Sequence, residues 1–367
     1  MKEKMKQLAN YYKPYRFLFW SDMVVAVIGA GITLVIPLIV RYITNHVIHL
    51  ENPLPMILKL AVLMLGLVVL EAFCNFYQAY YGHIMGAKME RDMRAEIFEH
   101  YQKLSFHFYD NQKVGQLLSR ITNDLFEISE LLHHGPEDVV ISLIKFVGSF
   151  IILCTINPAL TLVTFAFLPP ILIYAFLLNG RMKRAFKLRR EKIADINTQI
   201  EDSLAGIRAV KSFGNEEIEM EKFAQGNEAF VDSKRISYRY MGLYHSGLGA
   251  MTTMVTIGVL VAGAVMMTNG RLELTDLITF LLYINNFTEP VTKLVNFTEQ
   301  FQNGYSGYDR FLEMMSIAPD IEDAPDAVSM DHVKGDIRFE NVSFHYEDHN
   351  EKVLSNVNLE VKPGDYV

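Results

Sequence analysis

Ionisable and amide side chains interrupt several stretches that are otherwise apolar. Glu71 and Asn75 lie in one such stretch, Lys145 lies in a second and Glu289 lies in a third. A charge inside a lipid bilayer is costly, so these four residues are candidates for a substrate pathway through a membrane. A structural alternative stays open, in which Glu71 pairs with Lys145 and Glu289 pairs with Lys293 four residues later.

The apolar stretches are long enough to cross a bilayer. Because they carry no strand-like alternation, they predict an all-α polytopic membrane domain over 17–303, preceded by a short N-terminal segment, 1–16. Cys74 and Cys154 both lie inside apolar stretches, which favours buried thiols over a disulfide. We expect six long helices that continue into the cytosol, with spans near 17–40, 56–82, 136–156, 159–178, 245–268 and 274–297.

The distribution of Lys and Arg predicts the orientation. The segments 1–16, 83–135 and 181–244 carry five, six and thirteen of these residues, whereas the connections between them carry one, none and one. Cytosolic loops are enriched in Lys and Arg. We therefore expect a multi-pass protein of the cell membrane with both termini in the cytosol. The net charge of −8 gives no indication of nucleic-acid binding.

Two cytosolic segments are too long and too helical to be simple loops. The second span and its continuation to residue 107 cover about 50 residues, or roughly 75 Å of helix. Each projecting pair of helices needs a tip, and the tips fall near 105–124 and 201–216. The residues of interest there are Phe108, Tyr109, Asp110, Gly115, Ser119, Arg120 and Asp124 in the first tip, and Glu201, Gly206, Lys211, Phe213 and Glu216 in the second.

These two tips resemble the coupling regions of ABC exporters that have six spans per half. The resemblance extends over the whole chain and is closest to bacterial multidrug or lipid half-transporters. It implies that the tips dock on nucleotide-binding domains, with Phe108, Tyr109 and Phe213 as bulky anchors. From the residues themselves, Gly115 permits a turn or a close backbone approach, and Arg120 can pair with Asp124 across one helical turn.

The resemblance also implies partners and a transported compound. The partners are the lipid bilayer and a second half-transporter, in a homodimer or a heterodimer. The transported compounds are amphipathic drugs or lipids, moved out of the cytosol. The family's cofactors are ATP and Mg²⁺.

The C-terminal residues predict the first strands of a nucleotide-binding domain, incomplete over 335–367, after an acidic linker at 304–334. Ile337 and Phe339 alternate, and the slip to Val342 predicts a β-bulge. Tyr346 matches the family's adenine-stacking aromatic. The glycine-rich phosphate loop and the acidic and histidine motifs of the family's ATPase are not in this sequence. We therefore expect this chain to bind ATP and Mg²⁺ weakly or not at all and not to hydrolyse ATP.

Two other functions stay open on the sequence. The missing phosphate loop favours a non-catalytic, truncated subunit without ATPase activity. A secondary transporter driven by an ion gradient is the other, although the long cytosolic helices and the absence of visible inverted repeats with broken helices argue against it.

Overall fold

The computed structural model describes residues 2–110, 112–329, 332–345 and 352–366. The chain divides into two compact units, Met1–Ala318 and Pro319–Val367. The first unit is helical and the second is a strand pair, so the architecture is the predicted all-α domain followed by a small β region. The two units are described separately below.

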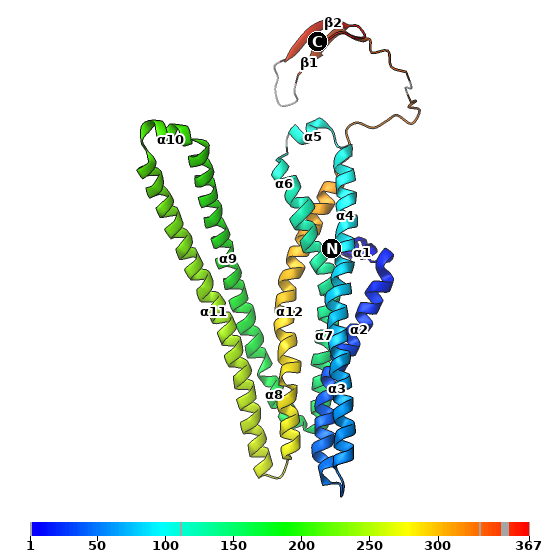
Figure 1. The fold of residues 1–367 in the computed structure, drawn as a ribbon, viewed down its shortest axis with the longest axis vertical. Coiled ribbons are helices and arrows are strands. Elements are labelled where there is room, and N and C mark those ends of the chain that lie inside the picture. Colours follow the sequence, from blue (N-terminus) through cyan, green and yellow to red (C-terminus); the bar gives the residue numbers. More distant parts are fainter. Residues whose placement is uncertain (1, 111, 330–331, 346–351, 367) are drawn as a thin grey trace. The chain divides into compact units, whose positions relative to one another are not determined.

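Long helices make up the first unit (Figure 1). Short connecting helices join them, and two five-residue π-helical segments, η3 and η4, lie within longer runs. In chain order the elements are α1 (Lys2–Asn10), η1 (Lys13–Tyr15), α2 (Arg16–Asn45), η2 (Val47–His49), α3 (Leu54–Tyr77), η3 (Gln78–Gly82), α4 (His83–Lys103), α5 (Phe106–Asp110), α6 (Val114–Ser119), η4 (Arg120–Asp124), α7 (Leu125–Ile156), α8 (Pro158–Ala166), α9 (Leu168–Ala205), α10 (Ile207–Phe213), α11 (Glu216–Thr268) and α12 (Leu274–Met315).

Within the described residues, five helical stretches are long and apolar enough to cross a membrane: Lys13–His49, Leu54–Lys103, Val114–Ile156, Pro158–Ala205 and Glu216–Thr268. The second of these is 50 residues long, which confirms that the span continues well beyond a bilayer. The sixth predicted span falls on α12, which is helical but does not reach the same apolar composition.

The position of α12 among the other helices explains its more polar composition. It packs along α7, α2 and α11, and it buries Phe280, Tyr283 and Phe287 completely or nearly so. A helix surrounded by protein can carry polar residues that a lipid-facing helix cannot, so hydropathy alone underestimates it.

The helices α9 and α11 form a hairpin that α10 closes at one end, and Figure 1 shows this hairpin diverging from the other helices toward α10. At the opposite end the hairpin between α7 and α8 is tight, as the sequence predicts. Pro158 is the first residue of α8, and the Asn157 side chain caps the helix by accepting a hydrogen bond from the backbone N–H of Leu160 at 3.0 Å.

The second unit contains β1 (Ile337–Phe344) and β2 (Leu354–Val361), which pair antiparallel. The register shifts between Phe339 and Val342, which confirms the predicted bulge. Asn341, inside that shift, adopts φ +57°. The predicted linker at 304–334 is too long at its N-terminal end, because α12 continues to Met315.

Pro37 and Pro136 lie inside long helices and leave two backbone carbonyls without their helical partner, and side chains from elsewhere in the chain replace it. Pro37 of α2 has no N–H for the carbonyl of Thr33, and Asn286 of α12 donates its amide to that oxygen at 2.9 Å. Pro136 of α7 does the same to the carbonyl of Leu132, which accepts from the Tyr12 hydroxyl. At each of these two prolines the carbonyl therefore accepts a hydrogen bond from a distant segment of the chain, α12 in one case and the turn after α1 in the other.

Replacing Asn286 with Leu should destabilise the protein. The change keeps the size of the side chain but leaves the Thr33 carbonyl without a donor, at a cost of about 0.5–2 kcal/mol. We expect a lower apparent melting temperature in detergent. The neighbouring Asn285 is exposed, so Asn285→Leu is the matched control and should leave the melting temperature unchanged. Equal melting temperatures for the two variants would contradict the assignment.

Candidate functional site: a polar cavity and two helical tips

A cavity of about 300 Å³ lies between α2, α3, α7 and α12. It brings together all four residues that the sequence proposed for a pathway, although they come from three helices far apart in the chain. Glu71 and Asn75 line it from α3, Lys145 lines it from α7 and Glu289 lines it from α12. The fourth wall, α2, contributes only small residues and Thr33, which leaves room for the polar side chains opposite.

Ion pairs in this cavity differ from those expected. Lys145 lies 3.0 Å from a carboxylate oxygen of Glu289, so the proposed pair between Lys145 and Glu71 is wrong. Lys293 lies 3.1 Å from Asp138 and 3.9 Å from Glu289. The spacing rule within one helix therefore accounts only for the weaker of the two contacts of Lys293, because facing helices bring closer partners.

Two carboxylates at the cavity stay without a cationic partner. Among the residues that the structure describes, no Lys, Arg or His lies within ion-pairing distance of Glu71 or Glu137. The cavity therefore carries an excess of negative charge, which favours a cationic or hydrogen-bond-donating ligand.

Sequence reasoning missed Glu137, which lines the cavity together with Gln78. The signal was present in their spacing. Residues 71, 75 and 78 recur at the period of one helix face, and residues 137 and 145 do the same on α7. Glu137 escaped notice because it lies at the edge of its predicted span.

The first tip consists of α5, α6 and η4. Phe108 is partly buried and packs against the core cluster of α4 and α7, and the Tyr109 hydroxyl donates to the carbonyl of Tyr101. Phe108 is thus partly covered by its own chain, whereas the Tyr109 ring stays exposed, and docking by these two aromatics stays a prediction. The side chain that the sequence missed is Phe106, which is 86% exposed.

Two further expectations for the first tip are wrong. Arg120 and Asp124 do not pair with each other, because η4 is π-helical and changes the i,i+4 geometry. Asp124 instead accepts two hydrogen bonds from Arg310 of α12, at 2.6 and 2.8 Å, and Arg120 lies 3.5 Å from Glu313. Gly115 lies in α6 with open space around it, so no close approach requires a glycine there.

The remaining residues of the first tip are accessible. Asp110 and Ser119 are exposed at the ends of α5 and α6, and Leu117 packs inward between them. Exposed polar residues around a few exposed apolar ones are typical of a surface that meets another protein.

The second tip is α10 with the ends of α9 and α11. Glu201 is exposed near the end of α9, Gly206 connects α9 to α10, and Gly214 at φ +63° ends α10 in the left-handed conformation. Lys211 pairs with Glu216 at 2.8 Å, and its hydrogen bond lowers the pKa of that carboxyl. This pair fixes the turn after α10.

Apolar side chains are exposed over the second tip. Phe213 is 79% exposed, and Leu204 and Met220 are also exposed. A groove of about 390 Å³ beside them is lined by these last two residues, Ile207 and Val210 among others. Exposed apolar surface of this kind on a soluble projection indicates a protein interface.

Residues 19–291 match the protein family described as the ABC transporter transmembrane region. The chain belongs to the ABC transporter transmembrane family. Its long helices, its tips and its polar cavity therefore form an ABC transporter membrane domain.

Several bacterial proteins are similar to this membrane domain over 99% of its length. An uncharacterized ABC transporter ATP-binding protein of Bacillus subtilis, YwjA, is 36% identical. A putative multidrug export ATP-binding/permease protein of the same organism, YgaD, is 24% identical, and one of Staphylococcus aureus is also 24% identical. The chain spans 63%, 63% and 64% of the length of these three relatives.

One predicted site residue of the ABC transporter chain, Tyr346, lies outside the described residues, so adenine stacking stays a prediction. The described strands β1 and β2 expose Ile337, Phe344 and Leu354.

The pair between Lys145 and Glu289 can be tested by a double-mutant cycle. Lys145→Gln should destabilise this ABC transporter domain by about 0.5–2 kcal/mol, because it leaves Glu289 with only its longer contact to Lys293. We expect Glu289→Gln in the same chain to recover part of that loss, measured as apparent melting temperature in detergent. Strictly additive effects would contradict the pair. Glu51→Gln, an exposed carboxylate outside the cavity, in place of Glu289→Gln is the control that should not recover stability.

Proposed function

We propose that this chain is the membrane half of an ATP-driven exporter that moves amphipathic compounds out of the cytosol. The observation that carries the proposal is the exposed apolar surface of the second tip, centred on Phe213, at the end of a long two-helix projection. A projection of this length has a mechanical use when its end is held by another domain, because a rigid helix then transmits the movement of that domain.

Nucleotide chemistry belongs, in this proposal, to a part of the protein that this chain does not contain. The described strands supply no glycine-rich loop with a lysine, so the residues at hand do not fit ATP and Mg²⁺. The relatives named ATP-binding proteins are longer than the matched region. We propose that the parent protein holds ATP and Mg²⁺ in that additional length.

A second half-transporter is the proposed partner, in a bilayer with both termini in the cytosol. The hairpin of α9 and α11 supports this arrangement, because it diverges from the other helices of its own chain (Figure 1). Large apolar side chains along α11 are exposed, among them Ile257, Val261 and Val265, and lipid or a partner chain would cover them.

The cavity supports the proposed type of compound. Its carboxylates Glu71 and Glu137, which have no cationic partner among the described residues, favour a positive charge. A compound with a cationic group matches this feature. Two relatives are named as putative multidrug export proteins, which agrees with this class of compound.

Coupling through the second tip can be tested in the full-length protein, reconstituted in vesicles with ATP and Mg²⁺. Phe213→Ala should lower ATP-dependent movement of the probe ethidium about five- to thirtyfold, the loss typical of a docking anchor. Folding should be unaffected, because the side chain is exposed. Tyr238→Ala, an exposed aromatic on the stem of α11, is the control. Unchanged transport by the Phe213 variant would contradict coupling through this tip, and ethidium movement without ATP would contradict the ATP-driven function.

The charge preference of the cavity gives a second test. Glu71→Gln removes one uncompensated charge and should weaken transport of ethidium about fivefold, equivalent to ~1 kcal/mol of a charged contact. Transport of a neutral amphipathic dye should not change, which separates substrate recognition from loss of the transporter. Glu51→Gln, an exposed carboxylate outside the cavity, is the matched control. Equal loss for both dyes would contradict a role in recognising charge.

A further inference from the structure

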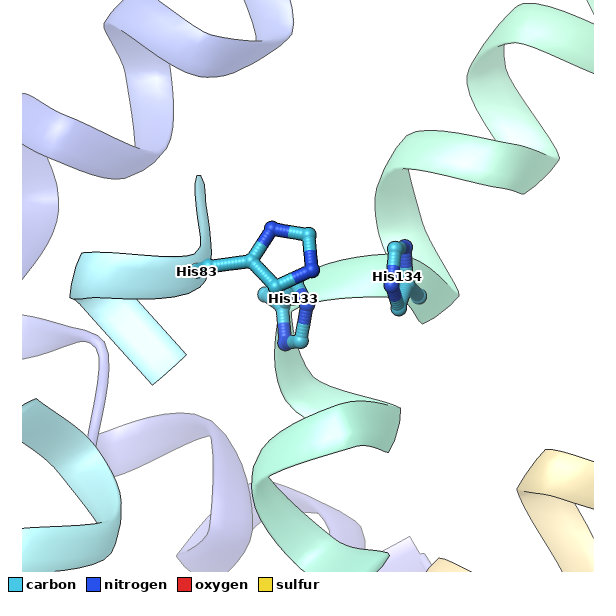
Figure 2. A group of neighbouring side chains, drawn as sticks. All are labelled: His83, His133 and His134. Atoms are coloured by element: carbon cyan, nitrogen blue, oxygen red, sulfur yellow. The ribbon is translucent and has the colours of Figure 1, made fainter. Parts of the chain in front are cut away.

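Three histidines from two helices converge at one point, beside but outside the lining of the polar cavity. His83 is the first residue of α4, and His133 and His134 lie on α7 (Figure 2). One ring nitrogen of each lies within 4.8 Å of those of the other two. The ring centroids are 4.1 to 5.1 Å apart.

His133 has a nitrogen that needs a partner. Its side chain is 2% exposed, and Nδ1 lies 2.8 Å from the carbonyl oxygen of Ser129. Because that oxygen only accepts, Nδ1 carries the proton and Nε2 carries a lone pair. Within the described residues Nε2 is buried and has no hydrogen-bond partner. A backbone carbonyl that fixes the tautomer is the usual outer contact of a metal-binding histidine.

The approach of α4 to α7 depends on a glycine at this point. A Cβ atom on Gly86 would lie 2.8 Å from His133 Nδ1, so only glycine lets the imidazole occupy this position without displacement. Gly86 is one helical turn beyond His83. One turn of α4 therefore carries both His83 and Gly86, the glycine that leaves room for the His133 ring.

The surroundings favour a cation. Both carboxylate oxygens of Asp22 are buried without a hydrogen-bond partner among the described residues and lie next to Gly82, which precedes His83. Glu130 lies 3.8 Å from His134 Nε2. Lys293 is the positively charged side chain near His134, and it forms an ion pair with Asp138, which offsets its charge.

The distances suit a transition metal after a small adjustment. Zinc bound by imidazole has bonds of about 2.0–2.1 Å, which places ligand nitrogens about 3.4 Å apart in a tetrahedral site. His83 is exposed, so its side chain can rotate to close the remaining gap. Three imidazoles without thiolates are a donor set for a first-row divalent ion.

We propose that His83, His133 and His134 bind one first-row divalent metal ion, such as Zn²⁺, and so connect α4 to α7. These two helices are the stems that lead to α5 and α6 of the first tip. A bound ion would restrain the two stems relative to each other. The effect of this restraint on coupling between the first tip and a docked domain rests on the proposed function. The binding itself does not depend on that function.

The test uses the full-length protein in detergent, without a histidine tag and after treatment with a chelator. Titration with Co²⁺ should give one bound ion per chain, seen as visible absorption of a coordinated ion, and Zn²⁺ should displace it. His83→Gln and His134→Gln should each weaken binding at least tenfold. His245→Gln, an exposed histidine on α11, is the control and should bind as the unmodified protein does.

A thermal measurement distinguishes a lost site from a lost fold. Without metal, His83→Gln should melt at the unmodified temperature, because the side chain is exposed. Addition of Zn²⁺ should raise the melting temperature of the unmodified protein but not that of the variant. Absence of Co²⁺ binding, or equal Co²⁺ binding by all three variants, would overturn the proposal. Ordered water would then be the expected hydrogen-bond partner of His133 Nε2.

Discussion

A backbone carbonyl inside a membrane domain must have a hydrogen-bond donor from the protein, and much of this structure follows from that constraint. Pro37 and Pro136 remove two such donors from the middle of long helices. Asn286 and Tyr12 replace them from α12 and from the N-terminal segment. The two prolines therefore remove hydrogen bonds within single helices, while the replacement donors connect those helices to distant segments of the chain.

The position of α12 is the clearest result of this constraint. Asn286 holds its middle against α2, and ion pairs hold both ends: Asp276 with Arg41 at 2.7 Å and Arg310 with Asp124 at 2.6 Å. Such contacts need polar residues on a helix that is otherwise buried. For this reason α12 contains no segment as apolar as those of the five candidate spans, and for the same reason it can contribute Glu289 and Lys293 to the cavity.

Charges in the cavity and the histidine cluster lie close together along α7. Glu137 faces the cavity one helical turn after His133, which faces α4. One helix thus carries polar groups of two kinds one turn apart on one side, and it continues through η4 into the first tip. A continuous helical run therefore connects the cavity and the histidines to the tip.

Hydrophobic length, the bias of Lys and Arg and the tip motifs are local properties. The sequence by itself therefore determined the helical class, the long projections, the bulge in β1 and four of the polar residues that line the cavity. The sequence did not determine the ion pairs. Lys145 pairs with Glu289 and not with Glu71, and Asp124 pairs with Arg310 and not with Arg120. The partners lie on helices far apart in the chain, and the π-helical geometry of η4 separates Arg120 from Asp124. The convergence of His83 with His133 and His134 is likewise invisible in the sequence, since about fifty residues separate them. Only the packing of α4 against α7, made close by Gly86, brings their nitrogens together.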